Sequence, residues 1–251
     1  ADSLDMTKTD PFCRRKVKEG KTNFTLLHIL LAAYVRAISQ KPGINRFIAG
    51  QHIYARNDIE INMVIKRAMT LDSPDTVVTV HFLPTDTVDD VYEKFNRAVM
   101  ENVRENDDNS FDKLNRALVF IPGILIRAVV RLLFWADYHG WLPRKLTMLS
   151  PFHGTMFITS MGSLGIPPIY HHLYDFGNLP VFGSFGCKRR ALEVEEDGTV
   201  VQRKYLDLKF VLDERIVDGY YYAAFFKHYR SILRHPETLD LPPEEILSDI
   251  D

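Results

Sequence analysis

The sequence lacks the features that would suit it to nucleic acid, to a membrane or to a disulfide framework. Its 31 Lys and Arg residues are balanced by 33 Asp and Glu residues, so the formal net charge of -2 offers no basic field to phosphates or anionic lipid. It has only two cysteines, Cys13 and Cys187, and no apolar run reaches the ~20 residues of a membrane span. The first residues also lack the basic and apolar regions of a signal peptide. We therefore expect a cytoplasmic protein without nucleic-acid partners or membrane contact.

Sequence motifs for metals and phosphates are missing as well. The patterns His-Glu-x-x-His and Cys-x-x-Cys do not occur, so we expect no metal site. Gly162-Ser-Leu-Gly165 and Gly183-Ser-Phe-Gly186 lack the spacing and the lysine of a phosphate-binding loop, and we interpret them as turns or points of close backbone approach. No linker or internal repeat divides the chain, which predicts a single domain over residues 1–251.

Hydrophobic periodicity predicts an alternation of helices and hairpins. Helices are expected over 24–40, 87–105, 111–135 (broken at Pro122-Gly123) and 220–234, with a polar loop over 106–110. Strands are expected around Leu4 and Met6 and over 51–55, 59–65, 76–82, 155–160, 181–186, 191–195 and 199–212. We expect 51–55 to pair with 59–65, and 191–195 with 199–212 through Asp197-Gly198. The regular spacing of a parallel sheet is absent, so the predicted fold class is α/β, a two-layer sandwich of a mixed, largely antiparallel sheet and helices.

The segment 111–135 contains two arginines, Arg127 and Arg131, four residues apart in an otherwise apolar stretch. It would suit either a helix packed on its own domain or subunit with both arginines outward, or a helix lying on a membrane surface. We favour the first interpretation, because two charges attract lipid only weakly.

Two further segments carry groups capable of chemistry. His171-His172 would serve as ligand, base or partner of a buried carboxylate, or as a structural loop pair, and on a strand the two side chains would face opposite sides. Asp213-Glu-Arg-Ile-Val-Asp-Gly219 is a charged cluster between a predicted strand and the last helix. Taken alone, it predicts a solvated turn with an ion pair between Arg215 and Asp218.

Four segments, taken in order, resemble the catalytic domain of the dihydrolipoamide acyltransferases of 2-oxo acid dehydrogenase complexes and, more distantly, chloramphenicol acetyltransferase. The predicted helix 24–40 with Lys41-Pro-Gly-Ile-Asn-Arg-Phe47 resembles that family's first long helix and its continuation P-x-x-N. Phe157-Ile-Thr-Ser-Met-Gly162 resembles a strand that ends in S-N-L-G, and Val181-Phe-Gly-Ser-Phe-Gly186 resembles a strand that ends in glycine before basic residues. Asp213-Glu-Arg-Ile-Val-Asp-Gly219 resembles D-H-R-x-x-D-G.

The resemblance implies a chloramphenicol acetyltransferase-like sandwich that assembles as a homotrimer or larger homo-oligomer, with active sites between subunits. It implies acyl transfer from a thioester, with coenzyme A (CoA) thioester as co-substrate and no bound cofactor. In the family, a histidine takes the proton of the attacking thiol or hydroxyl, and a side-chain hydroxyl stabilises the tetrahedral oxyanion. No lipoyl domain, subunit-binding domain or flexible linker is expected here, and the segment 111–135 is longer than the family implies. This insertion would cover a substrate channel, mediate assembly or touch a membrane.

Carried over residue by residue, the family's histidine falls on Glu214, a departure from the motif. An ordinary Glu is about two pK units less basic than His, although burial would raise its pKa, so the position supports either a changed base or an inactive site. The oxyanion hydroxyl falls on Thr159. His172 follows closely enough to be a replacement base.

Other retained positions are assigned supporting roles. Ser160 and His171 are expected to line the substrate channel, and Arg215, Asp218 and Gly219 to be structural, with Asp218 in an ion pair and Gly219 allowing a tight start to the last helix. The expected function is acyl transfer from a CoA-type thioester to a thiol, hydroxyl or amine acceptor. The alternatives are a catalytically inactive structural or regulatory relative and an acyl-CoA binding module.

Overall fold

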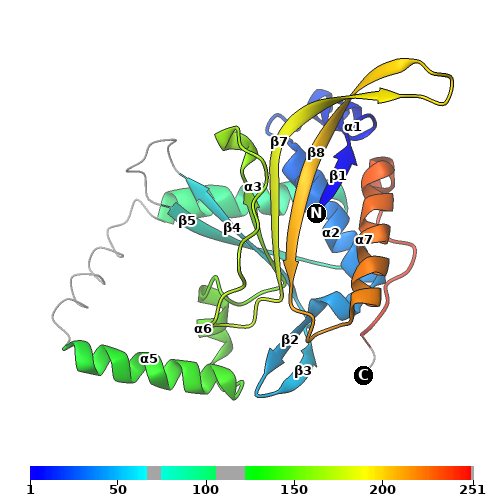
Figure 1. Ribbon diagram of the computed structural model, residues 1–251. Coiled ribbons are helices and arrows are strands. Elements are labelled where there is room, and N and C mark those ends of the chain that lie inside the picture. The colour runs from blue at the N-terminus through cyan, green and yellow to red at the C-terminus, as the bar shows by residue number, and fades with distance from the viewer. Residues whose placement is uncertain (67–74, 106–121, 250–251) are drawn as a thin grey trace.

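A six-stranded mixed sheet with the order β1-β8-β7-β6-β4-β5 organises the chain (Figure 1). The computed structural model describes residues 1–66, 75–105 and 122–249. Its strands are β1 (Asp2–Asp5), β2 (Arg46–Ala49), β3 (His52–Ala55), β4 (Ile59–Lys66), β5 (Asp75–Phe82), β6 (Met156–Ser160), β7 (Val181–Val194) and β8 (Val200–Leu212). Its α-helices are α1 (Thr9–Lys18), α2 (Leu26–Gln40), α3 (Val88–Glu105), α5 (Gly123–Tyr138), α6 (Arg144–Leu149) and α7 (Gly219–Arg234).

The central strand β6 runs parallel to both of its neighbours, β4 and β7, whereas the other pairs in this sheet are antiparallel. The predicted α/β class with a mixed, largely antiparallel sheet is therefore confirmed. Two details were wrong: the pairing of segment 51–55, and the division of 181–195 into two strands. The segment 51–55 does not pair with 59–65; β3 pairs with β2 in a separate two-stranded sheet, while β4 pairs with β5 and β6. The physical reason is that the Asn45 amide donates to the carbonyls of Arg56 and Asp58, which holds this connection against the end of α2 rather than in a hairpin turn.

The predicted strands 181–186 and 191–195 are two halves of one strand, β7, with a register irregularity between Phe185 and Lys188. The first half is buried and the second is largely exposed, so their sequence patterns differ although the backbone is continuous. The outer halves of β7 and β8 form a hairpin arm that extends beyond the rest of the sheet (Figure 1).

One face of the sheet is packed against helices. Ile59, Ile61 and Met63 of β4 join side chains of α1, α2, α3 and α7 in one apolar cluster, so this face of the strand points inward. Helix α2 is the centre of this cluster, because all residues from Leu27 to Ser39 are buried, including the polar His28, Arg36 and Ser39.

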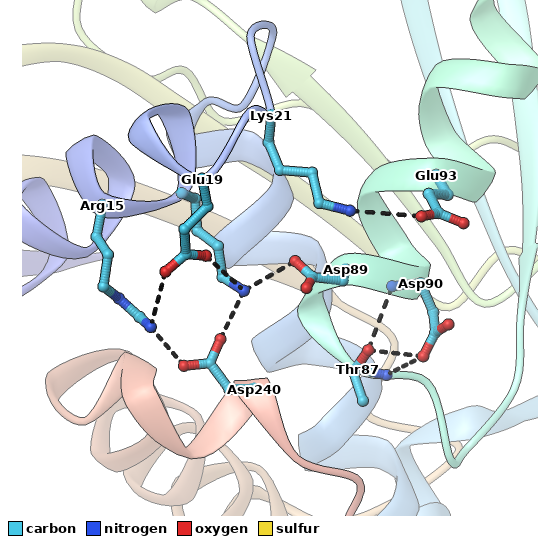
Figure 2. Close-up of polar contacts among 9 residues, drawn as sticks. Arg15, Glu19, Lys21, Thr87, Asp89, Asp90, Glu93 and Asp240 are labelled. Atoms are coloured by element: carbon cyan, nitrogen blue, oxygen red, sulfur yellow. Dashed lines mark hydrogen bonds and ion pairs between the residues drawn. The ribbon is translucent and has the colours of Figure 1, made fainter.

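A charged network fastens the outer helices together (Figure 2). The Lys16 side chain is only 3% exposed, and its Nζ lies 2.8 Å from a carboxylate oxygen of Asp89 and 2.7 Å from one of Asp240. These contacts join α1 to α3 and to the 3-10 helix Pro236–Asp240. Helix α3 begins as the sequence predicted: the Thr87 N–H donates to Asp90 Oδ2 at 2.9 Å.

The insertion lies at the periphery. Helix α5 has no buried residue and projects from the sheet, and only its C-terminal end approaches β2 and β3 (Figure 1). The expected loop 106–110 and the first half of the expected helix, up to residue 121, fall outside the described residues. No helix in the described ranges is long and apolar enough to cross a membrane.

Candidate functional site

Thr159 lies on the sheet face opposite the helices. Side chains alternate along β6, so Thr159 shares this face with Phe157, which stacks on Phe182 of β7 with a centroid distance of 5.4 Å. Thr159 is half-buried and level with Ser184 of β7. Its hydroxyl makes no hydrogen bond to any other described residue, so it is free to donate to a ligand. Ser160 is half-buried as well, and the same alternation directs it to the other face.

The two histidines belong to the same face. The His171 ring stacks on Phe182 at 4.4 Å and on the His172 ring at 4.5 Å, with interplanar angles of 13° and 18°. They lie in a loop rather than on a strand, which is why adjacent rings can stack instead of facing opposite sides. Phe182 is paired with Phe157, two residues before Thr159, so the histidine pair lies on the same sheet face as Thr159, and no hydrogen bond joins them among the described residues.

Glu214 lies beyond the end of β8 in an exposed turn and has no hydrogen bond or ion pair with any other described residue. Arg215 donates to both carboxylate oxygens of Asp213, at 2.8 and 2.7 Å. Burial alone would raise the pKa of the Asp213 carboxyl, but hydrogen bonds from Arg215 outweigh burial and hold that pKa below its ordinary value. The predicted ion pair between Arg215 and Asp218 is therefore wrong, because the guanidinium is already held by a residue two positions before it.

Asp218 also does not form the ion pair predicted for it. Its Oδ1 accepts the N–H of Tyr221 at 2.8 Å and so caps the N-terminus of α7. A glycine is not required at the next position either: Gly219 has no positive φ, and a Cβ added to it would meet no atom within 4 Å. By contrast, the expected close backbone approach at the two glycine segments is present, since a Cβ on Gly162 would lie 2.8 Å from the carbonyl oxygen of Gly186.

Within one chain, Glu214 and Thr159 do not converge. Thr159 is level with Lys209 of β8 through Ser184, and Glu214 comes five residues after Lys209. At about 3.3 Å per residue, the two are roughly 16 Å apart along the strand direction alone. One subunit therefore places the hydroxyl with the histidine pair, and places the carboxylate at the opposite end of the strands.

A polar group that the sequence did not reveal lies at the Glu214 end of the sheet. Thr155, fully buried, donates to Asn45 Oδ1 at 2.7 Å and accepts the Glu60 N–H at 3.0 Å. Nearby, His153 is 2% exposed and its Nε2 lies 2.8 Å from Asp137 Oδ1. In the sequence, only the glycine of His153-Gly154-Thr155 pointed to an unusual backbone before β6. The structure gives Gly154 a φ of +136°, which favours glycine.

Two cavities adjoin this polar group. One of about 300 Å³ is lined by Arg56, Glu60, Asp137, His153 and Asn178 among others. Another of about 800 Å³ is lined by Asp137, Tyr174 and Asp175 and extends to Arg215, the residue after Glu214. Among the residues that the structure describes, no group of three or more His, Cys, Asp or Glu side chains is arranged to hold a metal ion.

Comparison with known proteins bears on the resemblance. Residues 144–241 match the sequence model of the 2-oxoacid dehydrogenases acyltransferase (catalytic domain). No curated protein matches the sequence.

Solved structures match over nearly the whole chain. A probable dihydrolipoamide acetyltransferase from Listeria monocytogenes superposes with a TM-score of 0.59 at 15% identity, over 93% of this chain and 82% of that one. The dihydrolipoamide acetyltransferase of Azotobacter vinelandii gives 0.56 at 17% identity, over 96% and 82%. The cubic core of a pyruvate dehydrogenase multienzyme complex gives 0.55 at 17% identity, with the same coverage. Residues 144–241 thus carry the sequence pattern of the 2-oxoacid dehydrogenase acyltransferase catalytic domain, and the described chain has the fold of these domains, as the four motifs predicted.

Proposed function

We propose that the protein is an acyltransferase that moves an acyl group from a CoA-type thioester to a thiol, hydroxyl or amine acceptor. The observation that carries the proposal is the free hydroxyl of Thr159, half-buried on the sheet face opposite the helices, the same face on which the histidine pair lies. An unpaired donor at this depth is what a developing oxyanion requires. Thr159 also stands within the range that matches the acyltransferase family.

The site is completed by a second subunit in this proposal. Thr159 and the turn at Glu214 are too far apart in one chain to act on one thioester, so Glu214 of one copy would approach Thr159 of its neighbour. We propose a homotrimer or larger homo-oligomer, in keeping with the cubic core known for one structural relative. Such an assembly would also bury Glu214, and burial raises the pKa of a carboxyl and makes it a stronger base.

The turn 213–219 is anchored at both ends, and the Glu214 side chain between them has no partner among the described residues. Arg215 binds Asp213, Asp213 donates its N–H to the carbonyl of Pro180, and Asp218 caps α7, so both ends of the turn are fixed while Glu214 stays free. In the Azotobacter vinelandii enzyme, the catalytic roles of a serine, a histidine and an asparagine have been investigated, the last two being four residues apart. Glu214 and Asp218 have the same separation.

In the proposed reaction, the Glu214 carboxylate takes the proton of the acceptor as the acceptor attacks the thioester carbonyl. The hydroxyl of Thr159 donates to the oxyanion of the tetrahedral intermediate. As the intermediate collapses, the bond from carbon to sulfur breaks, and the proton held by Glu214 passes to the sulfur, so CoA leaves as thiol. His172 is the other candidate base, since it lies on the same face as Thr159.

A second function, a catalytically inactive structural or regulatory relative, is favoured by one observation. In the motif resemblance the family's histidine falls on Glu214, a carboxylate, and no other described residue forms a hydrogen bond or ion pair with it.

Acyl transfer from acetyl-CoA to dihydrolipoamide, followed by CoA release, tests the proposal. We expect activity in the parent protein, at least 100-fold less in Glu214→Gln, and none of that loss in the matched control Glu196→Gln, an exposed residue of the hairpin arm. If His172 is the base, His172→Asn is the inactive variant instead. An inactive parent that gains activity in Glu214→His would establish the inactive relative, and an inactive parent that still binds acetyl-CoA would establish a binding module.

A further inference from the structure

Three side chains at the Glu214 end of the sheet form a continuous hydrogen-bonded chain. Ser150 Oγ lies 2.8 Å from His153 Nδ1, and His153 Nε2 lies 2.8 Å from Asp137 Oδ1. Asp137 is on α5, and the other two residues are in the connection from α6 to β6. The second oxygen of Asp137 accepts the N–H of Gly177 at 3.1 Å, so both carboxylate oxygens are hydrogen-bonded.

The partners determine where the imidazole proton lies. A carboxylate can only accept, so Nε2 of neutral His153 must carry the proton that Asp137 binds. Nδ1 then presents a lone pair, and its neighbour at 2.8 Å is the hydroxyl of Ser150. The arrangement is that of a general base oriented by a carboxylate and directed at a hydroxyl, with the roles of the two ring nitrogens exchanged relative to serine proteases.

The surroundings suit an activated hydroxyl. Ser150 Oγ also accepts the N–H of Phe152 at 3.3 Å, a contact that stabilises negative charge on the oxygen. His153 is shielded from bulk water, and the edge of the Phe176 ring packs against it at a centroid distance of 5.6 Å. Ser150 itself is half-buried and therefore reachable. The 300 Å³ cavity lies on the side of His153 and Asp137, which line it, and Ser150 is not among its lining residues.

We propose that Ser150 is an acyl-accepting nucleophile that takes small acyl groups from activated esters and thioesters, with His153 as its base and Asp137 as a positioning residue. Ser150 Oγ attacks the carbonyl carbon and its proton passes to His153 Nδ1. As the tetrahedral intermediate collapses, the bond from carbon to sulfur (or to the ester oxygen) breaks, and the proton moves from His153 to the leaving group. The acyl group remains as an ester on Ser150 until water or another acceptor attacks it by the reverse proton transfers.

This site is separate from the one built around Thr159. It lies in one chain, needs no second subunit and does not use Glu214. It would give the protein a covalent acyl-enzyme, whereas direct transfer at Thr159 needs none.

The test uses a fluorophosphonate probe and p-nitrophenyl acetate, neither of which depends on CoA binding. We expect the probe to label the parent at Ser150, with mass spectrometry after tryptic digestion locating one adduct on that residue. Ser150→Ala should abolish labelling and the burst of p-nitrophenol. Ser231→Ala, an exposed serine on α7, should leave both unchanged. His153→Gln should slow labelling by 100-fold or more.

Asp137→Asn tests positioning rather than folding. It should slow labelling and alter the dependence of the labelling rate on pH while near-UV circular dichroism stays that of the parent. Thr159→Val should label normally, which separates a failure of this proposal from a failure of the proposed thioester site. A parent that is not labelled, or labelling that persists in Ser150→Ala, would overturn the proposal.

Discussion

Replacing Thr159 by Val should reduce activity without reducing stability. Thr155, four residues earlier, is the matched control, because its replacement should reduce stability without reducing activity. The Thr159 hydroxyl makes no hydrogen bond to any other described residue, so its removal breaks no hydrogen bond among them. We expect the free energy of unfolding to change by less than about 0.5 kcal/mol, because the substitution breaks no hydrogen bond among the described residues and valine is favourable in a strand. Loss of one oxyanion donor should lower kcat by about 10² to 10³, which corresponds to ~2.7 to 4 kcal/mol.

Thr155→Val should behave in the reverse way. Thr155 is fully buried, and its removal would leave the Glu60 N–H and the Asn45 amide oxygen without partners. At about 1 to 3 kcal/mol for each of the two unpaired buried groups, we expect the free energy of unfolding to fall by roughly 2 to 6 kcal/mol.

The assays are urea unfolding followed by circular dichroism and CoA release from acetyl-CoA for folded fractions of both variants. Activity per folded molecule should be nearly normal for Thr155→Val and strongly reduced for Thr159→Val. The reasoning is refuted if Thr159→Val is as destabilised as Thr155→Val, or if it keeps the parent's turnover.

Two further predictions concern the core. Burial lowers the pKa of His28 to about 4, below its ordinary 6.5, so as pH falls through this range the unfolded chain binds a proton that the folded chain excludes. Stability should therefore fall by about 3 kcal/mol between pH 6.5 and 4, and His28→Gln, which keeps an acceptor for the Thr25 N–H, should remove this dependence in urea melts at a series of pH values. The Tyr34 hydroxyl is fully buried without a partner among the described residues, so Tyr34→Phe should raise the free energy of unfolding by about 1 kcal/mol or more. Tyr229→Phe, which loses a bond to the Leu30 carbonyl, should lower it; the opposite order would contradict this assignment.

The sequence was sufficient where one physical rule governs a whole segment. Apolar periodicity located α2, α3 and β4 close to the ranges expected for them. It failed where partners are remote. Nothing local distinguishes β3, which pairs backward with β2, from a strand that pairs forward with β4, and the choice depends on contacts of Asn45.

For the candidate site as well, the sequence predicted some features and missed those that depend on remote partners. The position of Thr159 followed from the motif on β6, but its freedom from hydrogen bonds depends on what surrounds the open sheet face. The partner of Arg215 was misassigned, since Asp213 and Asp218 are both within reach in the sequence and only the cap of α7 removes Asp218. Asp137 and His153 carried no recognisable spacing, because one lies on the insertion helix and the other before β6.

A crystal structure of the protein grown with CoA would show whether Thr159 and Glu214 of two subunits form one thioester site. We expect an oligomer in which the pantetheine thiol ends between Thr159 of one subunit and the partner subunit's Glu214, with the Thr159 hydroxyl directed at the position of the thioester carbonyl. A monomer with no bound CoA, or an oligomer whose contacts leave Thr159 and Glu214 in separate solvent-exposed regions, would contradict this expectation.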